Sequence, residues 1–164
     1  MYKKIYIIGP IGSGKTTFSK SLSKKYNIKC YELDKVSWDD DNGNIRRSDE
    51  ESNRIFNDIL SNKSWIMEDV GREKYKEGKI QADIIYYIKL PKLIAYYRVT
   101  RRWIRQRLGK EIYNQPPTFK NWKYFMRAVK SYYKKEKKKI SDLQEYSDKL
   151  VFVTTKDIEK ILNE

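Results

Sequence analysis

The chain has 164 residues, of which 39% are hydrophobic and 14% aromatic, enough for a single domain, 1–164, with one core. It has no histidine and one cysteine, Cys30, which excludes serine–histidine and cysteine–histidine nucleophiles, intramolecular disulfides, and histidine or multi-cysteine metal sites. Residues 92–139 hold 16 Lys and Arg against 2 Asp and Glu, a net of +14 that equals the charge of the whole chain, so this segment attracts polyanions.

Apolar runs and helical periodicity alternate along the chain from its N-terminus. Strands are predicted at 3–8, 29–33, 64–67, 82–90 and 149–155. Helices are predicted at 15–26, 48–60, 92–108, 121–144 and 157–162, the second of them opened by a capping pattern of Ser48 and Glu51. This alternation predicts an α/β fold: a five-stranded parallel sheet with helices on both faces, in three layers.

Nothing in the sequence predicts a membrane span or a leader. No apolar run approaches the roughly 20 residues that cross a bilayer. The apolar stretch after Lys3 and Lys4 stops at Gly9-Pro10, which is too short for a signal peptide. With its one cysteine, the chain fits a reducing, cytoplasmic setting.

The segment between the first strand and the first helix matches the phosphate-binding pattern G-x-x-x-x-G-K-S/T. It reads Gly9, Pro10, Ile11, Gly12, Ser13, Gly14, Lys15, Thr16 and is followed by Thr17. Glycines let successive N–H groups turn toward triphosphate oxygens at the positive end of the helix. Lys15 is predicted to reach the β- and γ-phosphates of ATP, and the Thr16 hydroxyl to ligate Mg²⁺. The alternative is a glycine-rich turn without a ligand.

Two acids follow the apolar run Trp65-Ile66-Met67 and are candidates for organising the metal. Glu68 is preferred over Asp69 because it comes directly after that run. The competing interpretations are a solvated pair of acids, or an acid that pairs with Arg72.

Asp34 is expected at the end of the second strand, at the sheet edge where ligands bind in parallel α/β proteins. It is a candidate to accept the proton of an attacking hydroxyl or to bind the acceptor; the alternative is a capping role. Asp39, Asp40 and Asp41 resemble a metal cluster, but beside Asn42-Gly43-Asn44 they favour a solvated loop.

The predicted helix 92–108 carries Arg98, Arg101, Arg102 and Arg105 on one face, within about 100°. Arginine binds phosphate through paired hydrogen bonds, so Arg101 and Arg105 are candidates for stabilising the transferring phosphoryl group. A solvated basic face is the alternative.

The segment 119–133 mixes aromatic and basic residues, a pattern that also occurs where bases of nucleic acid stack. Helical spacing favours instead a core-facing stripe of Trp122, Phe125, Met126, Val129, Tyr132 and Tyr133. The opposite face is then solvated or binds anions.

Four features in order resemble a known group of small P-loop proteins. They are the loop GPIGSGKT, the stretch Tyr31-Glu32-Leu33-Asp34 with Trp38 after it, Trp65-Ile66-Met67-Glu68, and the basic segment 82–108. Together they resemble the DNA topology modulation proteins, the FlaR-like group, which are similar in fold to adenylate kinase and shikimate kinase.

The resemblance implies a P-loop fold with strand order 2-3-1-4-5 and a basic helical lid at about 98–120. It implies that Gly9 to Thr16 bind ATP, that Glu68 stands at a strand-end acid position, and that Arg72 matches an acceptor-binding arginine. The sequence departs from the group at Asp69, where relatives usually have glycine, and at Val70-Gly71, where nucleotide kinases have Phe-Pro.

These features favour a kinase that transfers the γ-phosphoryl group of Mg·ATP to an unidentified small-molecule or nucleotide acceptor. One alternative is a nucleic-acid-associated ATPase that holds phosphates through 92–139. Another is a regulatory nucleotide-binding protein without turnover.

Overall fold

The computed structural model describes residues 2–39, 45–111 and 116–163. In these ranges, seven strands form a five-stranded sheet and a two-stranded ribbon. The strands are β1 (Lys4–Ile8), β2 (Cys30–Glu32), β3 (Trp38–Asp39), β4 (Ile45–Arg46), β5 (Trp65–Asp69), β6 (Ile84–Ile88) and β7 (Leu150–Val153). The α-helices are α1 (Lys15–Tyr26), α2 (Leu33–Ser37), α3 (Asp49–Leu60), α4 (Lys76–Gln81), α5 (Lys92–Arg107), α6 (Phe119–Asp142) and α7 (Thr155–Asn163), with 3₁₀ turns η1 (Glu73–Tyr75) and η2 (Leu143–Tyr146).

The main sheet is parallel throughout, in the order β2-β5-β1-β6-β7. Counted along the chain within this sheet, that order is 2-3-1-4-5, so the predicted fold and strand order are confirmed. In register, Ile7 of β1 lies beside Glu68 of β5 and Ile8 beside Asp69. The start of the phosphate loop therefore lies next to both acids.

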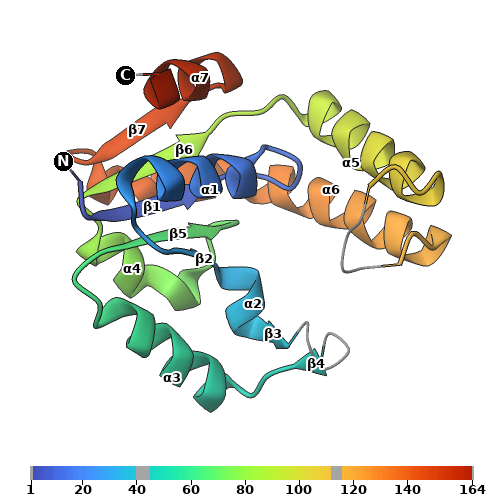
Figure 1. Cartoon of the computed structure of the whole chain (residues 1–164). Helices are drawn as coiled ribbons and strands as arrows, with labels where there is room; N and C mark the ends of the chain where they lie inside the picture. The colour runs from blue at the N-terminus through green and yellow to red at the C-terminus, as the bar shows by residue number, and fades with distance from the viewer. Residues whose placement is uncertain (1, 40–44, 112–115, 164) are drawn as a thin grey trace.

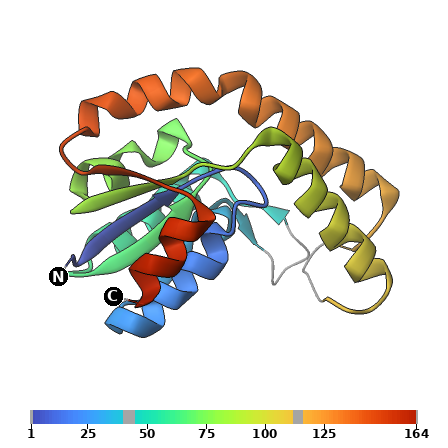
Figure 2. The same cartoon turned by 90° about the horizontal axis from the view of Figure 1, so that it is seen from above.

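Helices cover both faces of the sheet (Figures 1 and 2), and alternating strand residues build a core on each face. Ile5 and Ile7 pack with Phe18 and Leu22 of α1 and with the apolar side of α7. Tyr6 and Ile8 face the opposite core, formed with α2, α3, η1 and η2. Since successive strand side chains point to opposite faces, helices are needed on both, and the result is three layers.

A third core joins α5 to α6, which lie side by side in both views (Figures 1 and 2). It contains Val99 and Val129 together with part of the aromatic stripe on α6. The core-facing interpretation of that stripe is confirmed, because Val129 and Tyr132 are buried and Trp122, Phe125, Met126 and Tyr133 are half-buried.

The cap predicted at Ser48 is formed, since its hydroxyl accepts the Glu51 N–H at 3.1 Å. Thr118 forms a second cap by accepting the N–H of Asn121 at 3.1 Å, so α6 starts two residues before the predicted position 121. The second strand, in contrast, ends earlier than predicted. β2 stops at Glu32, and Asp34 lies in the first turn of α2, because Leu33 and Val36 bury into the core at helical spacing.

The structure also contains elements that the sequence did not indicate: α2, the ribbon β3–β4, and η1 with α4. Asp39 lies in β3 rather than in a loop, whereas Asp40, Asp41 and Asn42-Gly43-Asn44 lie outside the described residues. β5 extends through Asp69, so both acids are strand residues.

Candidate functional site

The phosphate loop connects β1 to α1 in a conformation that requires glycine at two places. Gly12 and Gly14 have φ of 80° and 91°, in the left-handed region. A Cβ on Gly14 would meet no atom within 4 Å, so the space beside the loop at the start of α1 is open. The buried Ser13 hydroxyl has no hydrogen-bond partner among the described residues. An open cradle with a buried unpaired donor fits an oxygen-rich ligand.

Gly9 is required for close packing instead. A Cβ there would lie 2.8 Å from Ser13 Oγ and 3.1 Å from Ile88 Cβ. The loop is thus held tightly against β6 at its start and is open at its end.

Lys15 is held in the cradle by two oxygen groups. Its Nζ donates to the Pro10 carbonyl at 3.1 Å and lies 3.9 Å from Glu68 Oε2. Burial lowers the pKa of Lys15, and the nearby Glu68 carboxylate partly opposes this. The ammonium is therefore poorly solvated, and additional negative charge in the cradle would stabilise it.

Thr16, in the first turn of α1, contacts Glu68 near the end of β5. The Thr16 hydroxyl donates to Glu68 Oε1 at 2.5 Å, and the Glu68 side chain is buried. A hydroxyl, a carboxylate and phosphate oxygens are ligands that suit Mg²⁺, which is usually held by one or two carboxylates and substrate phosphates. No group of three or more acidic or cysteine side chains able to hold a metal alone occurs in the described parts of the chain. The residues present therefore fit a magnesium ion shared with a nucleotide.

A second polar cluster follows at the ends of β2 and β5. The Arg72 guanidinium pairs with Asp34 Oδ1, donates to the Leu33 carbonyl at 3.3 Å, and lies 3.4 Å from Asp69 Oδ1. Asp69 Oδ2 accepts the backbone N–H of Arg72 at 2.5 Å. Burial raises the pKa of the Asp69 carboxyl, opposed by the N–H groups of Arg72 and Val70.

The two acids after β5 therefore have separate partners. Glu68 contacts the phosphate loop, and Asp69 holds the turn that carries Arg72. Asp34 lies next to Arg72 although it sits in α2, because α2 begins directly at the end of β2. Its side chain is 67% exposed, so the carboxylate is accessible to a ligand.

Lys139 is a structural member of this cluster that sequence patterns did not reveal. Its Nζ donates to the Val70 and Gly71 carbonyls, both at 2.8 Å, and so fixes the turn in which Gly71 has φ of 80°. The residue stands in the lysine run 134–139, where composition gives no sign that one lysine points inward.

The four arginines predicted on one face of α5 lie in four different environments. Arg98 donates to the Gly12 carbonyl at 3.1 Å and to Thr155 Oγ1 at 3.4 Å, so it joins α5 to the phosphate loop. Arg102 lies over the ring of Phe125 on α6, 5.3 Å from its centroid. Arg105 pairs with Glu111 at 3.1 Å, and Arg101 is exposed. The structure therefore brings neither Arg101 nor Arg105 into contact with the described loop residues.

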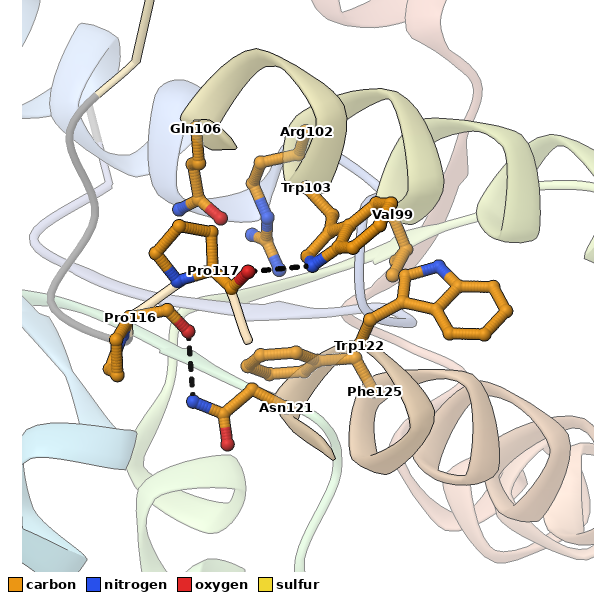
Figure 3. Close-up of a pocket in the computed structure, with 9 residues that line it drawn as sticks. All are labelled: Val99, Arg102, Trp103, Gln106, Pro116, Pro117, Asn121, Trp122 and Phe125. Atoms are coloured by element: carbon orange, nitrogen blue, oxygen red, sulfur yellow. Dashed lines mark hydrogen bonds between the residues drawn. The ribbon is translucent and has the colours of Figure 1, made fainter. Parts of the chain in front are cut away.

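A small cavity lies between the C-terminal half of α5 and the start of α6 (Figure 3). Trp103 Nε1 donates to the Pro117 carbonyl at 3.1 Å, and Asn121 Nδ2 donates to the Pro116 carbonyl at 2.9 Å. The volume of the cavity is about 10 Å³, room for at most one water molecule, so it is too small for a nucleotide. The two hydrogen bonds hold the segment before α6 against the helix pair.

Residues 5–114 match the family model described as an AAA domain, more than half of the chain. No curated protein matches this sequence. A gluconokinase from Sinorhizobium meliloti 1021 shares the fold at a TM-score of 0.58 and 12% identity, covering 98% of this chain and 87% of that one.

Two shikimate kinases share the fold as well. The enzyme from Acinetobacter baumannii, solved in complex with shikimate, aligns at a TM-score of 0.58 and 16% identity over 98% of this chain and 90% of that one. The enzyme from Bacteroides thetaiotaomicron aligns at 0.53 and 12% identity over 80% of each chain. The fold of this chain is therefore that of P-loop kinases.

Proposed function

Because this chain belongs to the AAA domain family of P-loop proteins, we propose that it is an ATP-dependent phosphotransferase that acts on a small molecule or nucleotide. Residues 1–164 form one nucleotide-binding domain, in which residues 9–17 bind Mg·ATP and a lid spans about 98–120. The observation that carries the proposal is that the phosphate loop and the Asp34–Arg72 pair occupy one edge of the sheet, where a donor and an acceptor can meet.

On the donor side, Lys15 moves from its internal contacts to the β- and γ-phosphate oxygens, and loop N–H groups bind the remaining oxygens. Bound Mg²⁺ neutralises charge on the β- and γ-phosphates. The Thr16 hydroxyl and the Glu68 carboxylate are the residues that hold it. The short Thr16–Glu68 contact and the closeness of Lys15 to Glu68 support this assignment.

On the acceptor side, Arg72 binds a negatively charged or oxygen-rich part of the acceptor, and Asp34 accepts the proton of its attacking hydroxyl. The hydroxyl oxygen forms a bond to the γ-phosphorus, the bond to the β-phosphate oxygen breaks, and ADP leaves. Arg101 and Arg105 are proposed to approach the phosphates when the lid closes and excludes water.

Transfer of labelled phosphate from ATP to a panel of nucleosides, nucleotides, sugars and hydroxy acids tests the proposal directly. The panel includes shikimate and gluconate because of the two kinds of structural neighbour. We expect transfer to at least one class of acceptor, with turnover lost in Lys15→Ala. Full activity in that variant contradicts the phosphate-loop assignment.

We also infer that the chain is a FlaR-like member of the P-loop proteins, a finer placement that rests on the Glu32-Leu33-Asp34 stretch followed by Trp38. Cys30 is free in the structure, which suits the cytoplasmic setting that we propose.

A second candidate function, a nucleic-acid-associated ATPase, is favoured by the outer face of α6. Eight exposed cations form no ion pair with any residue in the described ranges: Lys120, Lys123, Arg127, Lys130, Lys134, Lys135, Lys137 and Lys138. Nucleic-acid binding that neutralises several phosphates falls steeply between about 50 and 200 mM salt, whereas nucleotide binding to the loop is much less sensitive. Stimulation of ATP hydrolysis by DNA with that salt dependence would favour this second function.

A further inference from the structure

The outer face of α5 carries a stripe of large apolar side chains with no described partner element. Leu93, Tyr97, Ile104 and Leu108 are 79%, 62%, 45% and 62% exposed. At about 100° per residue, the four positions fall within about 60° of one another around the helix axis. Leu108 is the residue directly after the last residue of α5. Figures 1 and 2 show α5 at the edge of the fold, beside α6 and away from the sheet.

This stripe faces away from the phosphate loop. Arg98, which contacts the phosphate loop, lies about 100° around the helix from it. Ala95 and Val99 point into the shared core with α6 and are buried. A protein surface normally shows exposed apolar side chains singly, whereas four lie in one line here. The face is therefore a candidate interaction surface.

The charges around the stripe indicate the chemistry of the binding partner. α5 contains six Lys and Arg and no acidic residue. Arg101 and Arg105 border the stripe on one side, and Arg107 borders it on the other. A helix with an apolar stripe and flanking cations is typical of helices that lie in the plane of a membrane surface, with the apolar side chains below the headgroups and the arginines among them.

We propose that this face of α5 binds to an anionic lipid bilayer surface. In this mode of binding α5 lies on the bilayer surface. No helix in the described part of the chain is long and apolar enough to cross a bilayer. A second copy packed face to face would oppose arginine to arginine. Nucleic acid has no apolar surface along its phosphate backbone to cover Leu93 and Ile104.

Cosedimentation of the full chain with vesicles tests this assignment. We expect binding to vesicles that contain phosphatidylglycerol and much weaker binding to pure phosphatidylcholine. The variant Leu93→Gln/Ile104→Gln/Leu108→Gln should lose about tenfold or more of the partition coefficient, because each aliphatic side chain contributes to burial in the interface. Arg107→Gln should lose about fivefold on anionic vesicles only.

The matched control is Ile45→Gln/Ile80→Gln, which removes two exposed isoleucines, 63% and 47% accessible, on other elements. It should bind vesicles as the wild type does. The melting temperature should be unchanged in the triple variant, since its three side chains are exposed.

Three results would overturn the proposal. They are wild-type protein that does not bind anionic vesicles, a triple variant that binds them as well as the wild type, and binding to duplex DNA without binding to vesicles. A concentration-dependent dimer that the triple variant abolishes, in protein that ignores vesicles, would assign the face to a second copy instead.

Discussion

Glu68→Gln separates the two roles that the structure gives to this carboxylate, as the counter-ion of Lys15 and as a neighbour of the Thr16 hydroxyl. The amide keeps the shape of the side chain and an acceptor for Thr16, but it removes the charge. At 3.9 Å, and with an effective dielectric constant of about 20, the lost attraction to Lys15 is about 4 kcal/mol. Since desolvation of the pair offsets part of this, we expect the free energy of unfolding to fall by about 2–3 kcal/mol.

The same substitution should change nucleotide binding in opposite directions with and without Mg²⁺. Without the metal, loss of a negative charge beside the phosphates should raise ATP affinity. With the metal, affinity should fall about 10- to 100-fold, the range seen when groups that support a metal are removed. Denaturant unfolding and calorimetric titration measure the two effects.

The matched control is Lys15→Met/Glu68→Gln, which removes both charges. It should regain most of the lost stability while binding ATP poorly, because it leaves no unpaired ammonium in the cradle. Wild-type stability in the single variant, together with wild-type affinity for Mg·ATP, would refute the pairing described above.

Further substitutions test the second cluster and the lid. Asp34→Asn should leave ATP affinity near normal and lower phosphoryl transfer about 10²-fold or more, the scale of acid–base groups; a parallel loss of both would assign Asp34 a structural role in holding Arg72. Asp69→Asn should flatten the pH dependence of stability. Because the pKa of Asp69 is raised in the folded state, ionisation favours the unfolded chain, and wild-type stability should fall relative to the variant as pH rises above about 4, as read from melting temperatures. Arg101→Ala and Arg105→Ala should reduce kcat more than they raise the KM for ATP, and equal effects on both would indicate loss of surface charge alone.

The fold class could be predicted from the sequence because the two signals for it, the alternation of strands with helices and the phosphate-loop motif, are local. Short apolar runs such as 3–8 alternate with helical periods, and the motif ending in Lys15-Thr16 fixes the connection between the first strand and the first helix. Strand order came from the resemblance to P-loop proteins and not from periodicity. The parallel pairing of β1 with β5 then placed Glu68 beside the loop, in contact with Thr16, which lies 52 positions away in the chain.

What the sequence did not reveal depends on contacts between distant segments. Asp34 was expected at a strand end, but the burial of Leu33 and Val36 starts α2 at Leu33, so Asp34 is a helix residue. Lys139 is one of several lysines in a run, and only the crossing of α6 over the β5 turn distinguishes it. Arg98, which the sequence pattern grouped with three other arginines, contacts the loop because α5 packs against Gly12.

A crystal structure with Mg²⁺ and a non-hydrolysable ATP analogue tests the site most directly. We predict the β- and γ-phosphates against the N–H groups of residues 12–16 and the Lys15 ammonium, with the metal between Thr16 and the phosphates. An analogue bound elsewhere while this loop stays empty would contradict the assignment of the protein as an ATP-binding phosphotransferase.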